Sequence, residues 1–295
     1  MNRVRECVGY HAYTPSQFHY PCGICVLDSG IYAHDDFENR IIAFHDFVEH
    51  RITLSDTYGH GTHIAGICAG SGLRSRGKYQ GMAPESRLVI GRVLGASGEG
   101  KIETLLEGIK WCIDNKKKYN IRLLNISVGL IQQVGEEKQQ ALLDAVEHAW
   151  DLGIVTVCAA GNNGPRAGSV TIPGSSAKVI TVGSVNVSGS QNRQSLSQYS
   201  GRGPTKQCIA KPEIYAPGND IISCANNGWY TKKTGTSMSV PVVTGGIALL
   251  LQEKPWLSPV EVKLRLFEKS KQIQGLEHHS WGMFYLPYFL SDKDN

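Results

Sequence analysis

The chain has 295 residues, of which 41% are hydrophobic, and a formal net charge of +4. A chain of this length can bury a large core as one α/β domain, and a slight charge of mixed sign does not indicate nucleic-acid binding. No apolar run reaches the roughly 18 residues of a membrane span, and residues 1–10 lack the apolar stretch of a signal peptide. We therefore expect a soluble, cytoplasmic protein that binds neither nucleic acid nor membrane.

The eight cysteines are spread over the whole chain, and no signal segment precedes them. In that setting they are expected to be reduced thiols rather than four disulfides. Cys22 and Cys25 form a C-x-x-C pair, but no second pair lies at metal-ligand spacing, so we prefer a structural role over a zinc or redox role. Cys68, Cys112 and Cys158 lie in apolar segments and are expected to be small core residues.

The first part of the chain predicts a peripheral segment followed by a buried strand. Residues 1–20 are polar and rich in tyrosine, and we expect them to form an arm over the surface of a single domain at 21–295. The apolar run at 22–27 is typical of a strand buried in a parallel sheet, and it ends at Asp28.

A loop and an edge strand are expected next, at residues 30–56, where His34 and His45 each stand beside an aspartate. A metal site built from these histidines is one alternative, and solvated loop residues are the preferred one. His60 then stands between two glycines and begins a helix that is predicted to end near Gly70.

Residues 87–94 predict a second buried strand, followed by a glycine-rich turn and a helix with one apolar face. Gly95, Gly100 and Lys101 match the G-x-x-x-x-G-K of a phosphate-binding loop, in the strand-loop-helix context that such a loop requires. Ile102 stands where that loop needs a Mg²⁺-binding serine or threonine. Nucleotide binding is therefore a minor alternative.

The second half of the chain continues the alternation of strands and helices, which is typical of a parallel sheet covered on both faces. Ser258, Pro259 and Glu261 predict a capping box that opens a helix to about Ser270. The apolar, aromatic tail at 281–290 is expected to pack on the surface, with partner binding as a minor alternative. The other expected elements are a helix at 136–152, strands at 154–160, 178–185 and 220–224, and a helix at 237–252.

Ser237 lies in a small flexible turn directly before the apolar run at 240–251. A helix that is apolar on every face belongs in a core, and Pro241 is expected in its first turn, where a missing N–H costs nothing. Ser237 is then either a helix-capping residue or a nucleophile, because a helix N-terminus favours developing negative charge. Asp28, His60 and Ser237 stand in one of the known chain orders of a catalytic triad, which favours the nucleophile.

Four short motifs give the sequence a specific resemblance. LDSG at 27–30, HGTHIAG at 60–66 and GTSMSVP at 235–241 resemble the three signature motifs of the subtilisin-like serine proteases, and GNNG at 161–164 resembles their oxyanion-hole segment. The similarity runs from about residue 20 to about residue 255, and it is strongest to the intracellular, AprX-like members. It implies a three-layer α/β fold and a serine endopeptidase. The implied catalytic residues are Asp28, His60 and Ser237 as the triad and Asn162 as the oxyanion-hole donor.

The same resemblance implies a substrate groove for peptides or unfolded polypeptides. Its walls are rich in glycine, which lets the backbone of a ligand come close. The implied wall residues are Gly98, Glu99 and Gly100 on one side and Ser127, Val128 and Gly129 on the other. Asn163 and Thr171 are implied near the pocket for the residue before the scissile bond. No acidic residue is evident there, so a strict preference for arginine or lysine is not implied.

His63, three residues beyond His60, is expected to pack or hydrogen-bond rather than to act as a second base. Secreted members of the resembled family commonly hold calcium in the loop after the helix of the catalytic histidine, and calcium usually needs carboxylate ligands. The corresponding segment 71–80 has three basic residues and no acidic one, so we expect this site to be absent and predict no cofactor. A weaker calcium site near Pro173, built from backbone carbonyls and Glu213, remains an alternative.

A pseudoprotease that holds peptides without cleaving them is an alternative function, although all four functional positions are present. General turnover of cytosolic peptides and dedicated leader-peptide processing are equally compatible with the motifs. Secreted relatives carry a pro-segment, whereas 27 residues precede Asp28 here, so we expect the chain to be either processed or able to fold unaided. The oligomeric state is left open.

Overall fold

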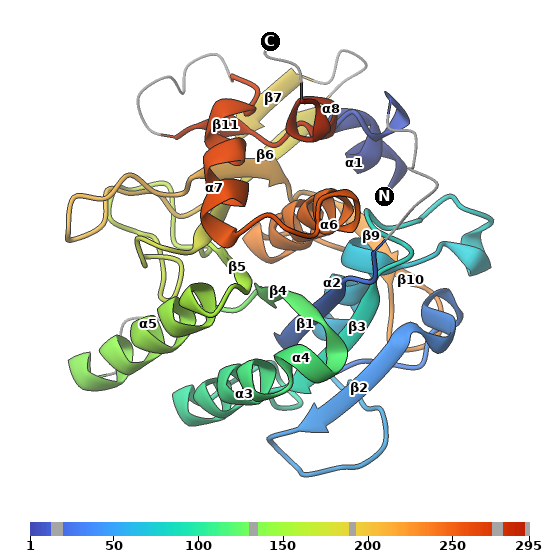
Figure 1. Cartoon of the computed structure of the whole chain (residues 1–295). Helices are drawn as coiled ribbons and strands as arrows, with labels where there is room; N and C mark the ends of the chain where they lie inside the picture. Colours follow the sequence, from blue (N-terminus) through green and yellow to red (C-terminus); the bar gives the residue numbers. More distant parts are fainter. Residues whose placement is uncertain (13–19, 130–134, 189–192, 273–279, 293–295) are drawn as a thin grey trace.

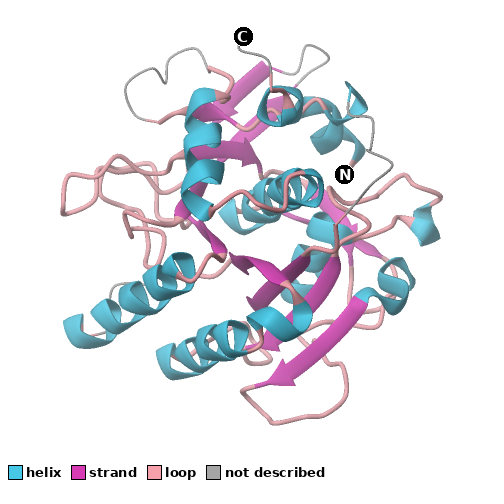
Figure 2. Ribbon diagram, viewed as in Figure 1, coloured by secondary structure: helices cyan, strands magenta, loops and turns pink. Residues whose placement is uncertain are grey.

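The computed structural model describes residues 1–12, 20–129, 135–188, 193–272 and 280–292. Within these residues, nine strands form a central sheet (Figure 1, Figure 2) in the order β11-β8-β6-β5-β4-β1-β3-β2, with β7 paired to β6. Neighbours along this order are parallel, and β7 runs antiparallel to β6. The strands are β1 (Gly23–Asp28), β2 (Ile41–Asp46), β3 (Arg87–Arg92), β4 (Ile121–Ile126), β5 (Val155–Ala159), β6 (Ile180–Ser188), β7 (Arg193–Leu196), β8 (Ile214–Pro217) and β11 (Gly282–Met283).

Helices cover both faces of this sheet. On one face, α2 (His60–Ala69) packs against α6 (Thr236–Glu253), which also contacts β4, β5, β6 and β8. On the other face, α3 (Ile102–Asp114) and α5 (Glu136–Asp151) lie side by side (Figure 1). Each pair of helices encloses its own large apolar cluster against the sheet. The predicted three-layer α/β fold is therefore confirmed.

The sequence patterns explain the two kinds of helix. The α3 helix buries one face, made of Ile102, Leu105, Ile109 and Cys112 among others, and exposes the rest, as its spacing of apolar residues predicts. The α6 helix is buried along nearly its whole length, and only Ser237 and Glu253 of its residues are half-buried. The predicted central helix therefore leaves one partly accessible position at its beginning, and this position is Ser237.

Residues 1–12 do not lie over the surface as an arm. They form α1 (Asn2–Cys7) and a short 3-10 helix (Tyr10–Ala12), and Val4, Val8 and Tyr10 are buried in the apolar cluster beneath α2 and α6. Val4 and Val8 have the i, i+4 spacing of one helix face, which the polar composition of the segment obscured. The predicted boundary at residue 20 stays a prediction, because residues 13–19 lie outside the described ones.

The C-terminal tail also belongs to the core, contrary to the prediction that it packs on the surface. β11 pairs with β8 at the edge of the sheet, and α8 (Leu286–Leu290) follows it. Phe284, Leu286 and Phe289 are buried in the same cluster as α6. Before this tail, α7 (Pro259–Glu268) begins with the predicted capping box of Ser258. A short helix, α4 (Lys116–Tyr119), completes the described helices.

The predicted strand at 220–224 exists as β9 (Ile221–Cys224), but it is not part of the parallel sheet. It pairs antiparallel with β10 (Tyr230–Lys233) in a separate two-stranded sheet. This β9–β10 hairpin lies against α2 and leads directly into α6. Its position therefore links the two helices that begin at the candidate site.

All eight cysteines are free in the structure, and seven of them are buried. The core position of Cys68, Cys112 and Cys158 is confirmed, and the reduced state of the thiols stays a prediction. None of the helices in the described part of the chain is both long enough and apolar enough to cross a membrane.

Candidate active site

The predicted catalytic residues come from segments that meet at one edge of the sheet. β1 ends with Asp28, β4 ends just before Ser127, and β5 ends shortly before Asn162. These three strands are parallel neighbours in the order β5-β4-β1, so their carboxyl ends lie side by side. The helices α2 and α6 begin with His60 and Thr236. Ligands of open α/β sheets bind at this carboxyl edge.

Asp28 is fully buried and holds the side chain of His60. The distance from Asp28 Oδ1 to His60 Nδ1 is 2.7 Å, and the same oxygen accepts a 2.8 Å hydrogen bond from the N–H of Ser29. A carboxylate can only accept, so Nδ1 carries a proton, and Nε2 is the ring nitrogen that remains for proton transfer. The ring of His60 is therefore oriented and has its tautomer assigned before any substrate binds.

A second buried carboxylate, that of Asp56, organises the first turn of α2. Its Oδ1 accepts from the N–H of Gly59 at 2.7 Å and from the hydroxyl of Ser29 at 2.8 Å. Its Oδ2 accepts from the N–H and the hydroxyl of Thr62 at 2.8 and 2.5 Å. Helices leave their first N–H groups without internal partners, and Asp56 accepts from that of Thr62 and from that of Gly59, which precedes the helix. Because His60 lies between these contacts, Asp56 is a positioning residue for it.

The sequence carries a signal for Asp56 outside the four motifs. An acidic residue shortly before a helix start is typical of helix capping, and Asp56 stands four residues before His60. Ser29 links this network to the triad, since its hydroxyl also accepts a 2.9 Å hydrogen bond from the N–H of Gly61.

Three other histidines have different environments. The ring nitrogen Nε2 of His63 lies 3.1 Å from the carbonyl of Ile221 and 3.2 Å from that of Thr231, so His63 joins α2 to the β9–β10 hairpin. Burial lowers its pKa to about 3, which keeps it neutral. This confirms the prediction that His63 packs. His45 is exposed as expected, whereas His34 is buried and the prediction of a solvated residue is wrong there.

Ser237 is the second residue of α6, and Gly235 precedes the helix as its N-cap, so the alternative of a capping serine is wrong. Ser237 Oγ donates a 2.7 Å hydrogen bond to the carbonyl of Ser127. Among the described residues, no hydrogen bond joins this oxygen to the ring of His60. Pro241 lies in the second turn rather than the first, because the helix starts at residue 236. It therefore cannot donate to the carbonyl of Ser237.

Asn162 is tied to the beginning of α6 by its side-chain oxygen. Asn162 Oδ1 accepts hydrogen bonds from the N–H and the hydroxyl of Thr236, both at 3.0 Å. Since the backbone N–H can only donate, the amide oxygen must face Thr236 and the Nδ2 group must face away. The side chain is exposed. Nδ2 and the N–H of Ser237 are thus two donors beside the nucleophile candidate.

The turn between β3 and α3 carries the first predicted wall. Gly100 forms an antiparallel bridge back to Leu94, before the turn. Gly98 has a φ of 84°, and a Cβ there would lie 2.5 Å from the ring of Tyr58, so only glycine fits. The carboxylate of Glu99 folds back inside the turn, within 2.1 Å of where a Cβ on Gly95 would lie.

The second predicted wall follows β4. Ser127 is buried, Val128 is half-buried, and Gly129 is exposed and immediately precedes residues 130–134, which lie outside the described ones. Asn163 is exposed beside Asn162. The roles of these residues in substrate binding stay predictions.

Thr171 connects this second wall with the oxyanion segment. A Cβ on Gly129 would lie 2.3 Å from Thr171 Oγ1, and one on Gly161 would lie 2.5 Å from Thr171 Cγ2. Thr171 Oγ1 is buried and has no hydrogen-bond partner in the described part of the chain. The two glycines therefore allow both segments to contact one side chain, which places Thr171 between Ser127–Gly129 and Asn162.

Positive groups lie at both of the positions that were considered for calcium. In segment 71–80, Arg74 donates its N–H to Asp36 Oδ1 at 3.0 Å and its guanidinium to Asp35 Oδ2 at 2.8 Å. At the weaker site, Glu213 Oε1 lies 2.6 Å from Lys211 Nζ and 2.8 Å from Lys263 Nζ. A calcium ion at Glu213 would have to displace ammonium groups. Independence from calcium stays a prediction, which is tested below.

Comparison with known proteins gives consistent matches. The profile of the subtilase family matches residues 22–282. The chain is 40% identical over 260 residues to "Serine protease AprX" of Bacillus subtilis (strain 168), covering 81% of this chain and 59% of that protein. It is 35% identical over 236 residues to the "Major intracellular serine protease" of the same organism, covering 77% and 67%. The solved structure of "a cold adapted subtilisin-like serine proteinase" superposes with a TM-score of 0.77 at 30% identity, covering 92% of this chain and 91% of the other. The chain thus spans about three fifths of the length of AprX.

Proposed function

Because the chain belongs to the subtilase family, we propose that it is a serine endopeptidase, which hydrolyses bonds within polypeptides. The observation that carries this proposal is the 2.7 Å hydrogen bond between Asp28 and His60. It orients the imidazole on α2, the helix that packs against α6 and its half-buried Ser237. A nucleophile, a base and an orienting carboxylate are the groups that acyl transfer to serine needs.

In this mechanism, Ser237 Oγ attacks the scissile carbonyl while His60 Nε2 takes its proton. Asp28 holds the Nδ1–H and stabilises the imidazolium that forms. Asn162 Nδ2 and the N–H of Ser237 donate to the oxyanion of the tetrahedral intermediate. His60 then gives the proton to the leaving amine, and a water molecule, activated by the same nitrogen, releases the acyl group from Ser237.

The hydroxyl of Ser237 has to turn before it can react. It donates to the carbonyl of Ser127 in the structure, and a rotation about its one side-chain bond moves it between staggered positions. Catalytic hydrogen bonds often tighten only when substrate binds. The second candidate function, peptide binding without cleavage, is favoured by this same contact, since a serine that stayed on Ser127 would not react.

Nucleotide binding has a physical argument against it. A phosphate-binding loop holds phosphate on its free N–H groups. Here Glu99 supplies the anion itself, because its carboxylate accepts from the N–H of Ser97 at 3.1 Å and from the Ser97 hydroxyl. The comparisons match proteases and give this alternative no support.

The substrate class of the proposal is an extended peptide or an unfolded polypeptide. The walls at Gly98–Gly100 and Ser127–Gly129 contain main chain at which a substrate strand can pair. Gly98 and Gly129 allow these walls to pack closely on Tyr58 and Thr171. One relative is named an intracellular protease, and we extend that location to this protein. These points rest on family membership and on the geometry of the walls.

The experiment that tests the function compares Ser237→Ala with Ser239→Ala. Ser239 lies on the same helix, and its buried hydroxyl donates to the carbonyl of Ala216 at 2.9 Å. We expect Ser237→Ala to abolish peptide hydrolysis and labelling by a serine-directed phosphonate, and we expect Ser239→Ala to retain both. Peptide cleavage by Ser237→Ala at the parent's rate would refute the proposal. A parent that binds peptides but neither cleaves them nor reacts with the phosphonate would support the binding function instead.

A further inference from the structure

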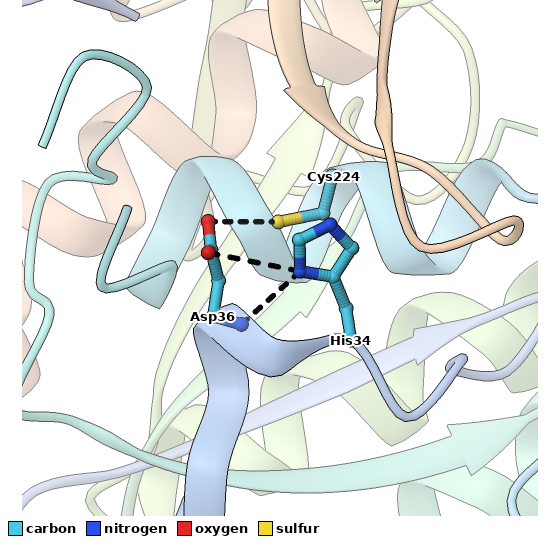
Figure 3. A group of neighbouring side chains, drawn as sticks. All are labelled: His34, Asp36 and Cys224. Carbon is cyan, nitrogen blue, oxygen red and sulfur yellow. Dashed lines mark hydrogen bonds and ion pairs between the residues drawn. The ribbon is translucent and has the colours of Figure 1, made fainter. Parts of the chain in front are cut away.

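A compact group of side chains with three different ligand atoms lies away from the triad. His34, Asp36 and Cys224 are 2%, 0% and 1% exposed. His34 precedes a 3-10 helix (Asp35–Arg40), which Asp36 belongs to, and Cys224 ends β9. Figure 3 shows the three side chains pointing toward one another from these two segments. One nitrogen, one oxygen and one sulfur atom from them all lie within 4.8 Å of one another.

The carboxylate of Asp36 is buried without a cationic side chain bonded to it. It accepts from the hydroxyl of Tyr230 at 3.0 and 2.8 Å, from the N–H of Arg74 at 3.0 Å and from the thiol of Cys224 at 3.5 Å. The guanidinium of Arg74 binds Asp35 instead, and that of Arg40 binds the main-chain carbonyl of Asp36. Buried charges are normally paired or bound to metal. Here only neutral donors contact the carboxylate.

The ring of His34 is oriented as in a metal-binding histidine. Its Nε2 lies 3.0 Å from the carbonyl of Trp229, which accepts and so assigns the proton to Nε2. Nδ1 accepts a 3.1 Å hydrogen bond from the N–H of Asp36 and lies 3.7 Å from Asp36 Oδ1. A metal ion at Nδ1 would replace this hydrogen bond, because the nitrogen has a single lone pair. Ligating histidines usually donate their second nitrogen to a carbonyl or carboxylate in this manner, which fixes the ring.

We propose that this cluster binds one divalent transition-metal ion of the zinc type through His34 Nδ1, Asp36 Oδ and Cys224 Sγ. On binding, the S–H bond of Cys224 breaks, its proton leaves to solvent, and a sulfur–metal bond forms. The two charges of the ion are then balanced by one carboxylate and one thiolate. A mixed nitrogen, oxygen and sulfur set suits zinc or cobalt, whereas calcium requires oxygen ligands. Tyr230 would not contact the ion, but its hydroxyl would hold the Asp36 carboxylate by the hydrogen bonds already present.

The cluster lies where a bound ion could stabilise the segment that leads to Ser237. The ion would join the segment after β1 to the β9–β10 hairpin, which His63 of α2 also holds through carbonyls of both strands. A ligand that binds only the folded state stabilises it in proportion to its occupancy. We therefore expect metal binding to raise the unfolding temperature of the whole chain.

The test is a titration of the full chain with Co²⁺, followed by absorption spectroscopy. All chains carry Cys208→Ser, which removes the one exposed thiol. We expect about one equivalent to bind with a thiolate-to-cobalt charge-transfer band, Zn²⁺ to displace it, and one proton to be released per ion. Cys224→Ser should lose the band, and Cys68→Ser, a buried thiol of α2 outside the cluster, should keep it.

Several outcomes would overturn the proposal. The absence of a charge-transfer band in the parent would overturn it. A band that survives unchanged in Cys224→Ser would also overturn it. A band lost equally in Cys68→Ser would assign the signal to a change of fold. If Cys224→Ser does not fold, His34→Gln carries the same comparison, since it removes the nitrogen ligand and keeps the thiol. None of these readouts depends on proteolysis, so they are independent of the proposed function.

Discussion

The two helices that meet at the candidate site begin in opposite ways. α2 is capped from nearby in the chain, by the carboxylate of Asp56 just before it. α6 is capped from 74 residues away, by the amide of Asn162 on Thr236. The first cap is charged and buried, and the second is neutral and exposed. A local cap makes the helix start independent of the rest of the fold, whereas a distant cap requires β5 and α6 to be assembled first.

The reactive side chains of these helices differ in the same sense. His60 is held by Asp28 at 2.7 Å, while the hydroxyl of Ser237 rests on the carbonyl of Ser127. The proposed base is thus oriented in the free protein, and the proposed nucleophile has one rotation left to make. Preorganisation of the charged partners lowers the cost of reorganisation during reaction. We therefore expect substrate binding to change the α6 side of the site, where the hydroxyl of Ser237 has to rotate.

Removing the base from the α2 side has the largest expected effect. We predict that His60→Ala lowers kcat by about 10⁶-fold, the loss seen when the triad histidine is removed from subtilisin. Without an acceptor for its proton, Ser237 stays a weak nucleophile on the carbonyl of Ser127. The measurement is kcat on a peptide substrate, with His45→Ala as the control, since His45 is exposed and outside the site. A loss below tenfold would mean that another group is the base.

Removing the hydrogen-bond donor from the α6 side has the next-largest expected effect on kcat. We predict that Asn162→Ala lowers kcat by about 10²–10³-fold with little change in KM, the range known for an oxyanion-hole donor of subtilisin. It should also cost about 1 kcal/mol of stability through the lost cap on Thr236. An equal loss appearing wholly in KM would assign Asn162 to ground-state binding.

Asn162→Asp separates the two roles of this side chain. The aspartate keeps an oxygen acceptor for the N–H of Thr236, but it replaces the donating Nδ2 group with a second acceptor. We expect its stability to match the parent while kcat falls at least as far as in Asn162→Ala. Equal stability losses in both variants would show that the cap does not depend on the oxygen.

Disturbing the cap of α2 has a smaller effect on rate. In Asp56→Asn, only one of the two oxygens remains, so an NH₂ group must face donors on one side of the network. We expect a loss of about 1–3 kcal/mol in the free energy of unfolding and a fall in kcat of up to about 10²-fold, because His60 shifts. Denaturant unfolding and kcat are the measurements. Asp35→Asn, on an exposed ion pair with Arg74, is the control and should change neither.

The sequence predicts the parts of this comparison that are local. The strand ending at Asp28, the helix starting at His60 and the buried helix after Ser237 follow from short apolar patterns, and the motifs around them name the candidate catalytic residues. Asp56 was also within reach, as an acidic residue before a helix start. The cap from Asn162 was not, because it depends on a contact between segments 74 residues apart.

The errors of the sequence analysis have a related cause. Val4 and Val8 were placed on the surface, and the tail at 281–290 outside the core, because each segment is short and its burial depends on distant partners. The strand Ile221–Cys224 was assigned to the parallel sheet, although it pairs with β10. His34 was expected to be solvated because nothing near it in sequence indicates that Cys224 and Tyr230 cover it.

Chelation of calcium is expected to have the smallest effect of all. At the weaker calcium site that was left as an alternative near Pro173, Lys263 Nζ donates to the carbonyls of residues 177, 178 and 179 and pairs with Glu213. Lys211 Nζ, whose pKa is lowered mainly by burial, donates to the same carboxylate and to the carbonyl of Val179. These are oxygen ligands of the kind calcium needs, and two ammonium groups already occupy them. The half-life of activity on warming should therefore be little changed by a calcium-selective chelator.

Lys263→Met is the matched variant, because it frees carbonyls beside Glu213 and should gain a dependence on added calcium. A large loss of half-life in the parent on chelation, restored by calcium, would show that an ion rather than an ammonium group holds this region.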